Sequence, residues 1–378
     1  LTGDGMQGNL GSAVALGDIT GDGAAEIIAS APFYQNADLT SAGRVYVYPG
    51  RASESSTPTI TPTGSEAQLL LGVSLAILGD LNGDGYADFA AGERSGPITR
   101  PGRVSVWYGA PAASMSPGLV VPGMSTSQRF GEALAGGDVN GDGFADLLVG
   151  LPTDTTVPGP GSVLVYYGGA TPDLTPDATL TGVTGERHGA RVAFLGDMNG
   201  DGYGDFVVGG PAFSGGSGRA VVYAGGTGTP QMLLMLGGRT GEAFGRSLGA
   251  PGDVNNDGFA DLLVGTPQAA VNGMESAGRA ALYLGGANPS SVPALSWSGT
   301  TAGDEFGSAF GSARDMNGDG FMDIVIGAAK APFSGRDGGP GSVFLYLGAP
   351  VPTTTARATW TGSVGGSQEP TGFGAAID

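Results

Sequence analysis

One nine-residue acidic segment occurs six times in the 378-residue chain, and this recurrence constrains the fold more than any other feature. Its consensus is Asp-x-Asn-Gly-Asp-Gly-aromatic-x-Asp, and the copies begin at Asp18, Asp80, Asp138, Asp197, Asp253 and Asp315. Successive copies start 62, 58, 59, 56 and 62 residues apart. Such a period indicates an array of one supersecondary unit, because each unit needs its neighbours to bury its apolar side.

Each repeat has the pattern of four short strands joined by turns. In the third copy a small-residue strand at 130–137 leads into the acidic segment 138–146, and apolar strands follow at 147–152, 161–168 and 178–182. The 74 glycines and 25 prolines make up about a quarter of the chain, so turns are frequent. No segment has a sustained 3.6-residue period, so we expect almost no helix.

Four short antiparallel strands per unit, repeated radially, describe an all-β fold, the β-propeller. We expect one domain over residues 1–378 with six blades, from repeats at 1–63, 64–122, 123–182, 183–238, 239–299 and 300–362. Residues 363–378 are expected to give a closing or partial strand. Because 371–378 resemble the first strand of another unit, seven blades are expected if the chain is excised from a longer array. A β-sandwich array would not need so regular a period.

The acidic segment has the composition of a calcium-binding loop. Calcium takes six to eight hard oxygens from carboxylates, amides, backbone carbonyls and water. We expect ligands from the side chains at positions 1, 3, 5 and 9 and from the main-chain carbonyl of position 7, with glycine at position 6. About six ions are expected, one per repeat. The candidate metal residues are Asp18, Thr20, Asp22, Ala24, Glu26, Asp80, Asn82, Asp84, Tyr86, Asp88, Asp138, Asn140, Asp142, Phe144, Asp146, Asp197, Asn199, Asp201, Tyr203, Asp205, Asp253, Asn255, Asp257, Phe259, Asp261, Asp315, Asn317, Asp319, Phe321 and Asp323.

Two other loop types have a similar composition. An EF-hand needs Glu at position 12, where this chain has apolar strand residues such as Val149. Metal-free turns held by Asp and Asn side chains are the second alternative, but acids at positions 1, 5 and 9 in all six copies favour a metal. Thr20 and Glu26 make the first site the weakest. We expect the ions to stabilise the folded chain rather than to catalyse a reaction.

The repeat also resembles a known family. Phe-Gly pairs such as 130–131 and 306–307 precede the acidic segment, and Gly-x-Pro follows it at 150–152 and 265–267. This order is similar to the FG-GAP repeat, which builds the N-terminal propeller of integrin α subunits, and it covers essentially the whole chain. The resemblance is to a bacterial-type integrin-α-like protein, and it implies an adhesion or protein-recognition module. The family propeller usually has seven blades.

Some positions depart from the family pattern. Leu10, Leu71 and His188 stand where the motif has Phe, and Gly-Glu-Arg at 92–94 and Gly-Ala-Ala at 327–329 replace Gly-x-Pro. His188 is the only histidine, so we expect it to be a packed structural residue. Arginine recurs after the opening glycine of the third strand, at Arg44, Arg103, Arg219 and Arg279, and we expect a structural ion-pair or stacking role there.

Charge and composition restrict the function classes. The formal net charge of −19 and the 16 basic residues disfavour nucleic-acid binding. Without cysteine and with one histidine, the chain offers no thiolate chemistry or zinc site. No run of 18 apolar residues predicts a membrane span. Because weak, exposed loops suit millimolar calcium, we expect an extracellular or cell-surface, secreted location.

The expected partner is a protein or glycan ligand. Variable loops at 33–42, 93–101, 153–160, 212–217, 268–277 and 329–340 should share the face opposite the metal loops, and variable loops on a rigid scaffold usually carry binding. We expect no enzyme, because no cluster of catalytic side chains is apparent outside the acidic loops. The alternative is a carbohydrate-binding, lectin-like propeller or a polysaccharide-active accessory, with Trp107, Trp297 and Trp360 as sugar platforms.

Overall fold

The structure is a computed structural model that describes residues 8–35, 38–50, 56–94, 101–112, 114–126, 128–153, 159–329 and 341–362. The fold is an all-β, six-bladed propeller, which confirms the predicted class. The chain divides into two compact units, Leu1–Val192 and Ala193–Asp378, with three blades assigned to each. The closing or partial strand predicted at 363–378 lies outside the described residues, as do residues 1–7.

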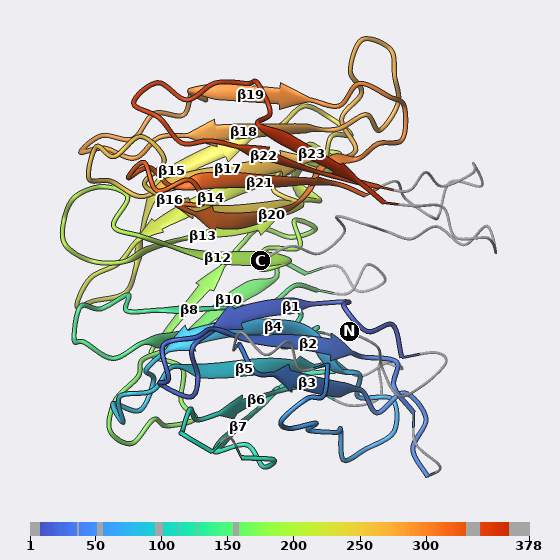
Figure 1. The fold of residues 1–378 in the computed structure, drawn as a ribbon, viewed down its shortest axis with the longest axis vertical. Coiled ribbons are helices and arrows are strands. Elements are labelled where there is room, and N and C mark those ends of the chain that lie inside the picture. The colour runs from blue at the N-terminus through green and yellow to red at the C-terminus, as the bar shows by residue number, and fades with distance from the viewer. Residues whose placement is uncertain are drawn as a thin grey trace. The chain divides into compact units, whose positions relative to one another are not determined.

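The first unit contains blades 1 to 3 (Figure 1). Blade 1 has β1 (Val14–Gly17), β2 (Glu26–Ala31) and β3 (Arg44–Tyr48); blade 2 has β4 (Leu71–Gly79), β5 (Asp88–Glu93), β6 (Arg103–Trp107) and β7 (Leu119–Pro122); blade 3 has β8 (Ala133–Gly137), β9 (Asp146–Leu151), β10 (Ser162–Tyr166) and β11 (Ala178–Thr181). In blade 1 the expected fourth strand is reduced to isolated bridges, which join Ile60 to Val47 and Thr63 to Arg44.

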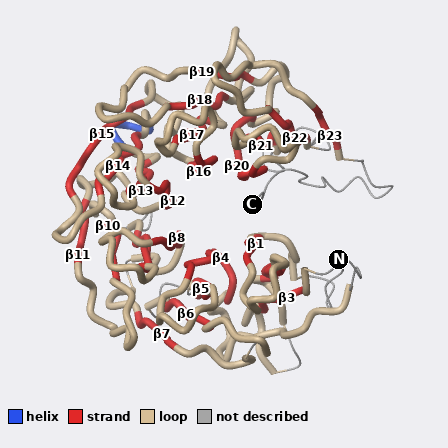
Figure 2. The backbone as a smooth tube through the Cα atoms, turned by 60° about the vertical axis from the view of Figure 1, so that its left-hand side comes forward, coloured by secondary structure: helices blue, strands red, loops and turns tan. Residues whose placement is uncertain are grey.

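The second unit contains blades 4 to 6 and repeats the same antiparallel order. Blade 4 has β12 (Arg191–Gly196), β13 (Asp205–Gly210), β14 (Arg219–Ala224) and β15 (Gln231–Gly237); blade 5 has β16 (Ser247–Gly252), β17 (Asp261–Thr266), β18 (Arg279–Tyr283) and β19 (Leu295–Ser298); blade 6 has β20 (Phe306–Arg314), β21 (Asp323–Ala328), β22 (Ser342–Tyr346) and β23 (Ala358–Thr361). The one helical turn of the described residues, α1 (Phe213–Gly216), is blue in Figure 2.

The inner strands of a blade are buried on both faces. Every residue of β9, β13 and β17 is buried, whereas the outermost strand β11 alternates between buried and exposed. A strand covered on both faces has a continuous apolar run instead of alternation. The apolar segments that follow the acidic loops are therefore the second strands, as the sequence predicted.

The hydrophobic cores lie between neighbouring blades. In the first unit Val104 and Val106 of blade 2 share one core with Phe130 and Leu147 of blade 3. In the second unit one core joins blades 4 and 5, and another joins blades 5 and 6. A single sheet therefore cannot bury its own faces, and each blade depends on its neighbour for stability.

The Phe-Gly motif lies where one blade meets the next. The glycine that opens a third strand forms a parallel bridge with the Phe position of the following blade, as Gly278 does with Phe306. Gly278 has φ +84, and a Cβ there would lie 2.3 Å from the carbonyl oxygen of Phe306. His188 occupies the Phe position opposite Gly161, is fully buried, and has Nδ1 3.2 Å from Oε1 of Glu186. Its predicted structural role is confirmed.

The recurring arginines have the expected ion-pair and stacking roles. Each is the first residue of the third strand of its blade. Its guanidinium contacts either a glutamate of the preceding loop or an aromatic ring. The contacts are Arg103 with Glu66 at 3.3 Å, Arg279 with Glu242 at 3.0 Å, Arg44 over the ring of Tyr34 at 3.8 Å, and Arg219 over the ring of Phe213 at 4.5 Å.

Replacing Gly278 by alanine should destabilise the second unit strongly. The left-handed φ alone costs of order 1–3 kcal/mol, and the added Cβ must displace the backbone of Phe306. Urea unfolding should show a loss of at least about 2 kcal/mol. Gly228→Ala is the matched control, because a Cβ at Gly228 meets nothing within 4 Å. Equal stability of the two variants would contradict the close-approach explanation.

Candidate metal centres

Each acidic loop joins the first and second strands of its blade, and its first aspartate organises the turn. In blade 2 the Oδ1 atom of Asp80 accepts hydrogen bonds from the backbone N–H groups of Gly83 at 2.7 Å and Asp84 at 3.1 Å, and Oδ2 accepts one from Gly85 at 2.8 Å. Asp18, Asp138, Asp197 and Asp315 repeat these three bonds. The loop therefore wraps around one carboxylate.

Positions 3 and 5 lie beside each other at the exposed tip of the loop. The side-chain amide of Asn82 donates to Oδ2 of Asp84 at 2.9 Å, and Oδ1 of Asn82 accepts from the backbone N–H of Asp84 at 3.0 Å. Oδ1 of Asp84 accepts from the N–H of Tyr86 at 3.0 Å. The amide–carboxylate contact recurs at 2.8–2.9 Å in the loops of blades 3 to 6.

Position 9 lies at the buried base of the loop. Asp88 is completely buried; its Oδ2 accepts from the N–H of Leu81 at 2.9 Å, and its Oδ1 accepts from the N–H of Gly109 at 2.8 Å. Asp146, Asp205, Asp261 and Asp323 make the same pair of bonds. The carboxylate thus joins the start of the acidic loop to the glycine after the third strand.

The first loop differs at the two positions that the sequence marked as weak. Glu26 is 2 % exposed, and its Oε2 accepts from the backbone N–H of Ile19 at 3.0 Å. The hydroxyl of Thr20 donates to Oε1 of Glu26 at 3.3 Å. In this copy position 3 is therefore drawn toward the base instead of toward Asp22 at position 5.

Burial raises the pKa of the position-9 aspartates in the loops of blades 2 to 5. The pKa is raised to about 6 for Asp88, Asp146 and Asp205 and to about 7 for Asp261. Desolvation is the largest cause, two backbone N–H groups oppose it, and the carboxylates at positions 1 and 5 raise the pKa further. At the exposed tip of the last loop the backbone N–H of Gly320 is the main cause of the lowered pKa of Asp315. A cation near the loop would favour the charged form of each of these carboxylates.

The donor set fits a hard cation. Positions 1, 3 and 5 bring two carboxylates and an amide carbonyl to one exposed tip, which is oxygen chemistry suited to calcium. In the structure the side-chain amide of position 3 donates a hydrogen bond to the carboxylate of position 5. Among the described residues no group of three His, Cys, Asp or Glu side chains is placed to hold a metal ion. In blade 2 positions 1 and 3 both accept from the backbone N–H of position 5, and position 9 accepts from backbone N–H groups at the base.

The loops also bind the next blade, which the sequence did not reveal. In the first unit the N–H of Ala145 donates to the carbonyl of Asp80 at 2.8 Å, and the N–H of Gly169 donates to the carbonyl of Leu81 at 2.9 Å. Equivalent bonds join blades 4 and 5 and blades 5 and 6. The aromatic residue at position 7 packs on the preceding loop, since a Cβ on Gly83 would lie 2.4 Å from the ring of Phe144. Position 7 therefore has a packing role besides its carbonyl.

The opposite end of each blade carries the variable loops. In blades 3, 4 and 5 a described residue of the loop between the second and third strands hydrogen-bonds to the connection to the next blade. The contacts are Gly185 N–H to the Gly159 carbonyl at 2.8 Å, Ala243 N–H to the Gly216 carbonyl at 2.9 Å, and Gly303 N–H to the Glu275 carbonyl at 2.9 Å. Within a blade the antiparallel order puts these loops and the acidic loop at opposite ends, as predicted.

The comparison with protein families is unambiguous for this chain. The FG-GAP repeat matches residues 10–48, 71–107, 130–166, 188–223, 244–283 and 306–346, which is more than half of the chain. The chain therefore belongs to the FG-GAP repeat family, and it is an integrin-α-like propeller. The six matched stretches begin at the Phe position of each blade, including those where Leu10, Leu71 and His188 replace Phe.

Two integrin α chains are among the similar proteins. The chain is 33% identical to rat (Rattus norvegicus) integrin alpha-7 over 158 residues, 41% of this chain and 14% of that protein. It is 34% identical to Drosophila melanogaster integrin alpha-PS2 over 217 residues, 52% of this chain and 15% of that protein. It therefore spans about a seventh of the length of these relatives. A solved exotype rhamnogalacturonan lyase, YesX, aligns with TM-score 0.47 and 14% identity over 92% of this chain and 57% of that chain. In the described part of the chain no helix is long and apolar enough to cross a membrane.

Lowering the pH of the metal-free protein should increase its stability between about pH 8 and pH 5.5. The raised pKa values mean that Asp88, Asp146, Asp205 and Asp261 bind protons in the folded state before the unfolded chain does. Their stabilising contribution grows as the pH falls through 7 and 6, and it is lost as the pH rises through that range. Thermal unfolding in metal-free buffers measures this change of stability with pH. Asp261→Asn should make the stability less dependent on pH. A stability that falls with acidification over this range would contradict the raised pKa values of these aspartates.

Proposed function

We propose that this protein is a calcium-binding FG-GAP propeller that acts outside the cell or at its surface as an adhesion or protein-recognition module. The single observation that carries the calcium proposal is the repeated oxygen-rich tip in the loops of blades 2 to 6, where a carboxylate oxygen of position 1 and the amide oxygen of position 3 accept from the same backbone N–H of position 5. The recognition proposal is supported by the membership of the FG-GAP family and by the similarity to integrin α chains.

The side chains at positions 1, 3 and 5 would hold the ion, and the main-chain carbonyl of position 7 would add a further oxygen. The carboxylate of position 9 would complete the set through lone pairs beyond the two that accept the backbone N–H groups. A bound cation supplies positive charge that offsets the carboxylates gathered in each loop. Six divalent ions would change the formal net charge of the chain from −19 to about −7. Because the loops also hydrogen-bond to neighbouring blades, ions held there would stabilise the contact between blades.

The proposed binding surface is the loop face, which we define as the loops between second and third strands together with the connections to the following blades. A rigid scaffold with variable loops is the usual arrangement for binding. The loop at 268–277 has a fixed backbone conformation, as a binding loop on a rigid scaffold needs. Val271 and Met274 in it exchange two backbone hydrogen bonds at 3.0 and 2.9 Å. We infer a role in binding without catalysis.

Calcium should bind in about six equivalents and raise the melting temperature. An ion present at a hundred times its Kd stabilises the folded state by about 2.7 kcal/mol per site, so removal by a chelator should lower the melting temperature markedly. Native mass spectrometry gives the stoichiometry. Asp142→Asn should lose one ion, because this carboxylate lies at the tip of the third loop. Asp173→Asn is the control, since Asp173 is an exposed carboxylate outside the acidic loops.

Two results would reject the calcium proposal. One is the absence of bound ions at millimolar calcium. The other is an equal loss of calcium in Asp142→Asn and Asp173→Asn, because a general charge effect would then explain the binding.

Binding of the intact protein to arrayed extracellular proteins and to a glycan array tests the recognition role. We expect binding to the protein array, and replacing residues 271–274 by a Gly/Ser tract should weaken this binding. Binding to glycans alone would favour the carbohydrate-binding alternative and overturn the proposal of protein recognition.

A further inference from the structure

The outermost strand of blade 4, β15, differs from the outer strands of the other blades (Figure 2). It has seven residues, whereas β7, β11, β19 and β23 have four each. Among the described residues only β14 pairs with it, so the backbone groups along its second edge pair with no strand of the described chain. We call this second edge the β15 edge. An edge of this kind can pair with a further strand.

The exposed side chains of β15 are apolar. Met232 and Met235 are 62 % and 51 % exposed, while Leu236 is buried in the core between blades 4 and 5. The register of β14 and β15 shifts between Val222 and Tyr223. Because of this shift, the two methionines are both exposed although they are three residues apart, a spacing that puts side chains on opposite faces of a regular strand. An apolar surface therefore lies beside the β15 edge.

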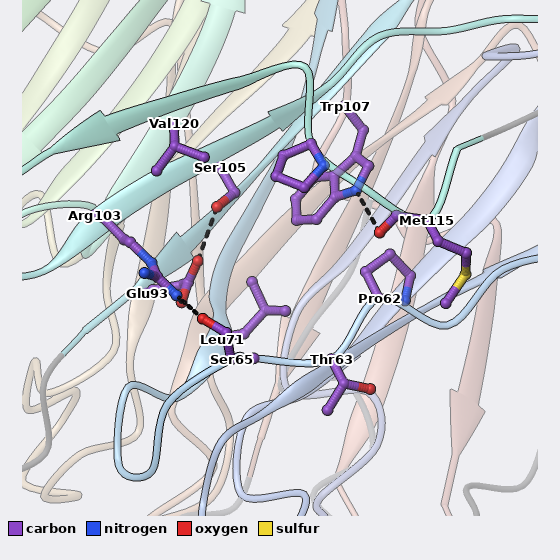
Figure 3. Close-up of a pocket in the computed structure, with 12 residues that line it drawn as sticks. Pro62, Thr63, Ser65, Leu71, Glu93, Arg103, Ser105, Trp107, Met115 and Val120 are labelled. Atoms are coloured by element: carbon purple, nitrogen blue, oxygen red, sulfur yellow. Dashed lines mark hydrogen bonds and ion pairs between the residues drawn. The ribbon is translucent and has the colours of Figure 1, made fainter.

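Other outer strands have protections that β15 lacks. The exposed residues of β11 are Thr179 and Thr181, and both fully exposed residues of β19 are serines. In β7 the exposed Val120 lines a cleft with Trp107 (Figure 3), and Pro122 ends the strand. Short strands, proline and charge are devices that prevent pairing at an edge. β15 is longer and contains neither proline nor a charged residue.

The distribution of charge around β15 favours a second copy of the chain as the partner. No charged residue occurs between Arg219 and Arg239, although the formal net charge of the chain is −19. Antiparallel pairing of β15 with its own copy is two-fold symmetric, so one surface serves both copies. Arg239 of each copy then lies beyond opposite ends of the paired strands, roughly 30 Å from its counterpart. The contact therefore brings no like charges together.

We propose that β15 pairs with β15 of a second copy of this chain, so that two four-stranded blades join into one continuous antiparallel sheet. This inference goes beyond the proposed function and does not rest on it. Methionine side chains adapt their shape to one another, so Met232 and Met235 of the two copies would pack together beside the paired strands. Contacts that bury less than about 1,200 Å² are weak. We therefore expect a reversible dimer at micromolar concentrations.

Sedimentation equilibrium of the intact protein, from low micromolar to millimolar concentration, tests the proposal. We expect the average mass to rise from 37.2 kDa toward twice that value and no further, because the proposed contact uses one edge of each copy. Added salt should strengthen the association, since it screens the repulsion between two acidic copies. A protein that stays monomeric, or assemblies that grow beyond the dimer, would overturn the proposal.

A double variant tests the two methionines. Met232→Thr combined with Met235→Thr copies the exposed threonines of β11. Threonine favours strands, so the melting temperature should be kept, while the association constant should fall at least about tenfold because the apolar contact is lost. Trp360→Thr is the matched control, because Trp360 is 47 % exposed on the outer strand β23, and it should dimerise as the wild type does. Equal losses would contradict a specific role of β15.

Two measurements separate strand pairing from packing of the methionines alone. Hydrogen exchange of the amides at 231–237 should slow at high protein concentration, because outward N–H groups gain acceptors. The chain has no cysteine, so Met235→Cys gives a single site for a short bismaleimide and should yield a covalent dimer. Met124→Cys, at a residue 68 % exposed outside β15, should not. A dimer without slower exchange, or equal cross-linking of both variants, would overturn the strand pairing.

A strand from an unrelated protein is the other occupant that the β15 edge would fit. A soluble peptide of alternating threonine and valine is the probe for it. If this peptide slows exchange at 231–237 while the protein stays monomeric at every concentration, the edge belongs to a foreign strand and self-pairing is wrong. These measurements are independent of calcium and of the loop face, so their failure would leave the proposed function intact.

Discussion

The buried carboxylate at position 9 is the interaction on which the rest of each blade depends. In blade 2 it accepts one N–H from the start of the acidic loop and one from the glycine that follows the third strand. A single side chain thus fixes three strands relative to one another at one end of the sheet. Without this acceptor, two buried backbone N–H groups would lose their partners, at a cost of about 1–3 kcal/mol each.

The contact between blades uses backbone as much as side chains. The glycine opening each third strand lets the next chain segment approach to a distance that a Cβ would forbid, as at Gly278. The Phe position beside it is buried between the sheets, and His188 shows that a polar ring is accommodated there when Glu186 is available as a partner. The same residues recur in each repeat because every blade must fit against the next one. A single sheet on its own would not require them.

Much of this arrangement could be predicted because the repeat displays it six times. The acids at fixed spacing, the apolar run after them and the glycine before the third strand predicted the blade and its strand order. The burial and the hydrogen-bond partners of individual side chains could not be predicted in the same way. Asp80 and Asp88 are the same residue type in one loop, yet one caps an exposed turn and the other is buried, because only tertiary packing brings Gly109 to the second. Glu93 appeared in the sequence only as a departure from Gly-x-Pro; its burial and its pairing with Arg103 became visible in the fold.

The hydrogen bonds that run from one acidic loop to the next blade have a consequence for local opening. When the loop of blade 2 opens, the N–H groups of Ala145 and Gly169 in blade 3 lose their acceptors. The cost of opening is then shared across the boundary, so neighbouring blades of one unit should exchange their loop amides as one group rather than one after another. The repeats are separate in the sequence, but their loops would not open independently of one another.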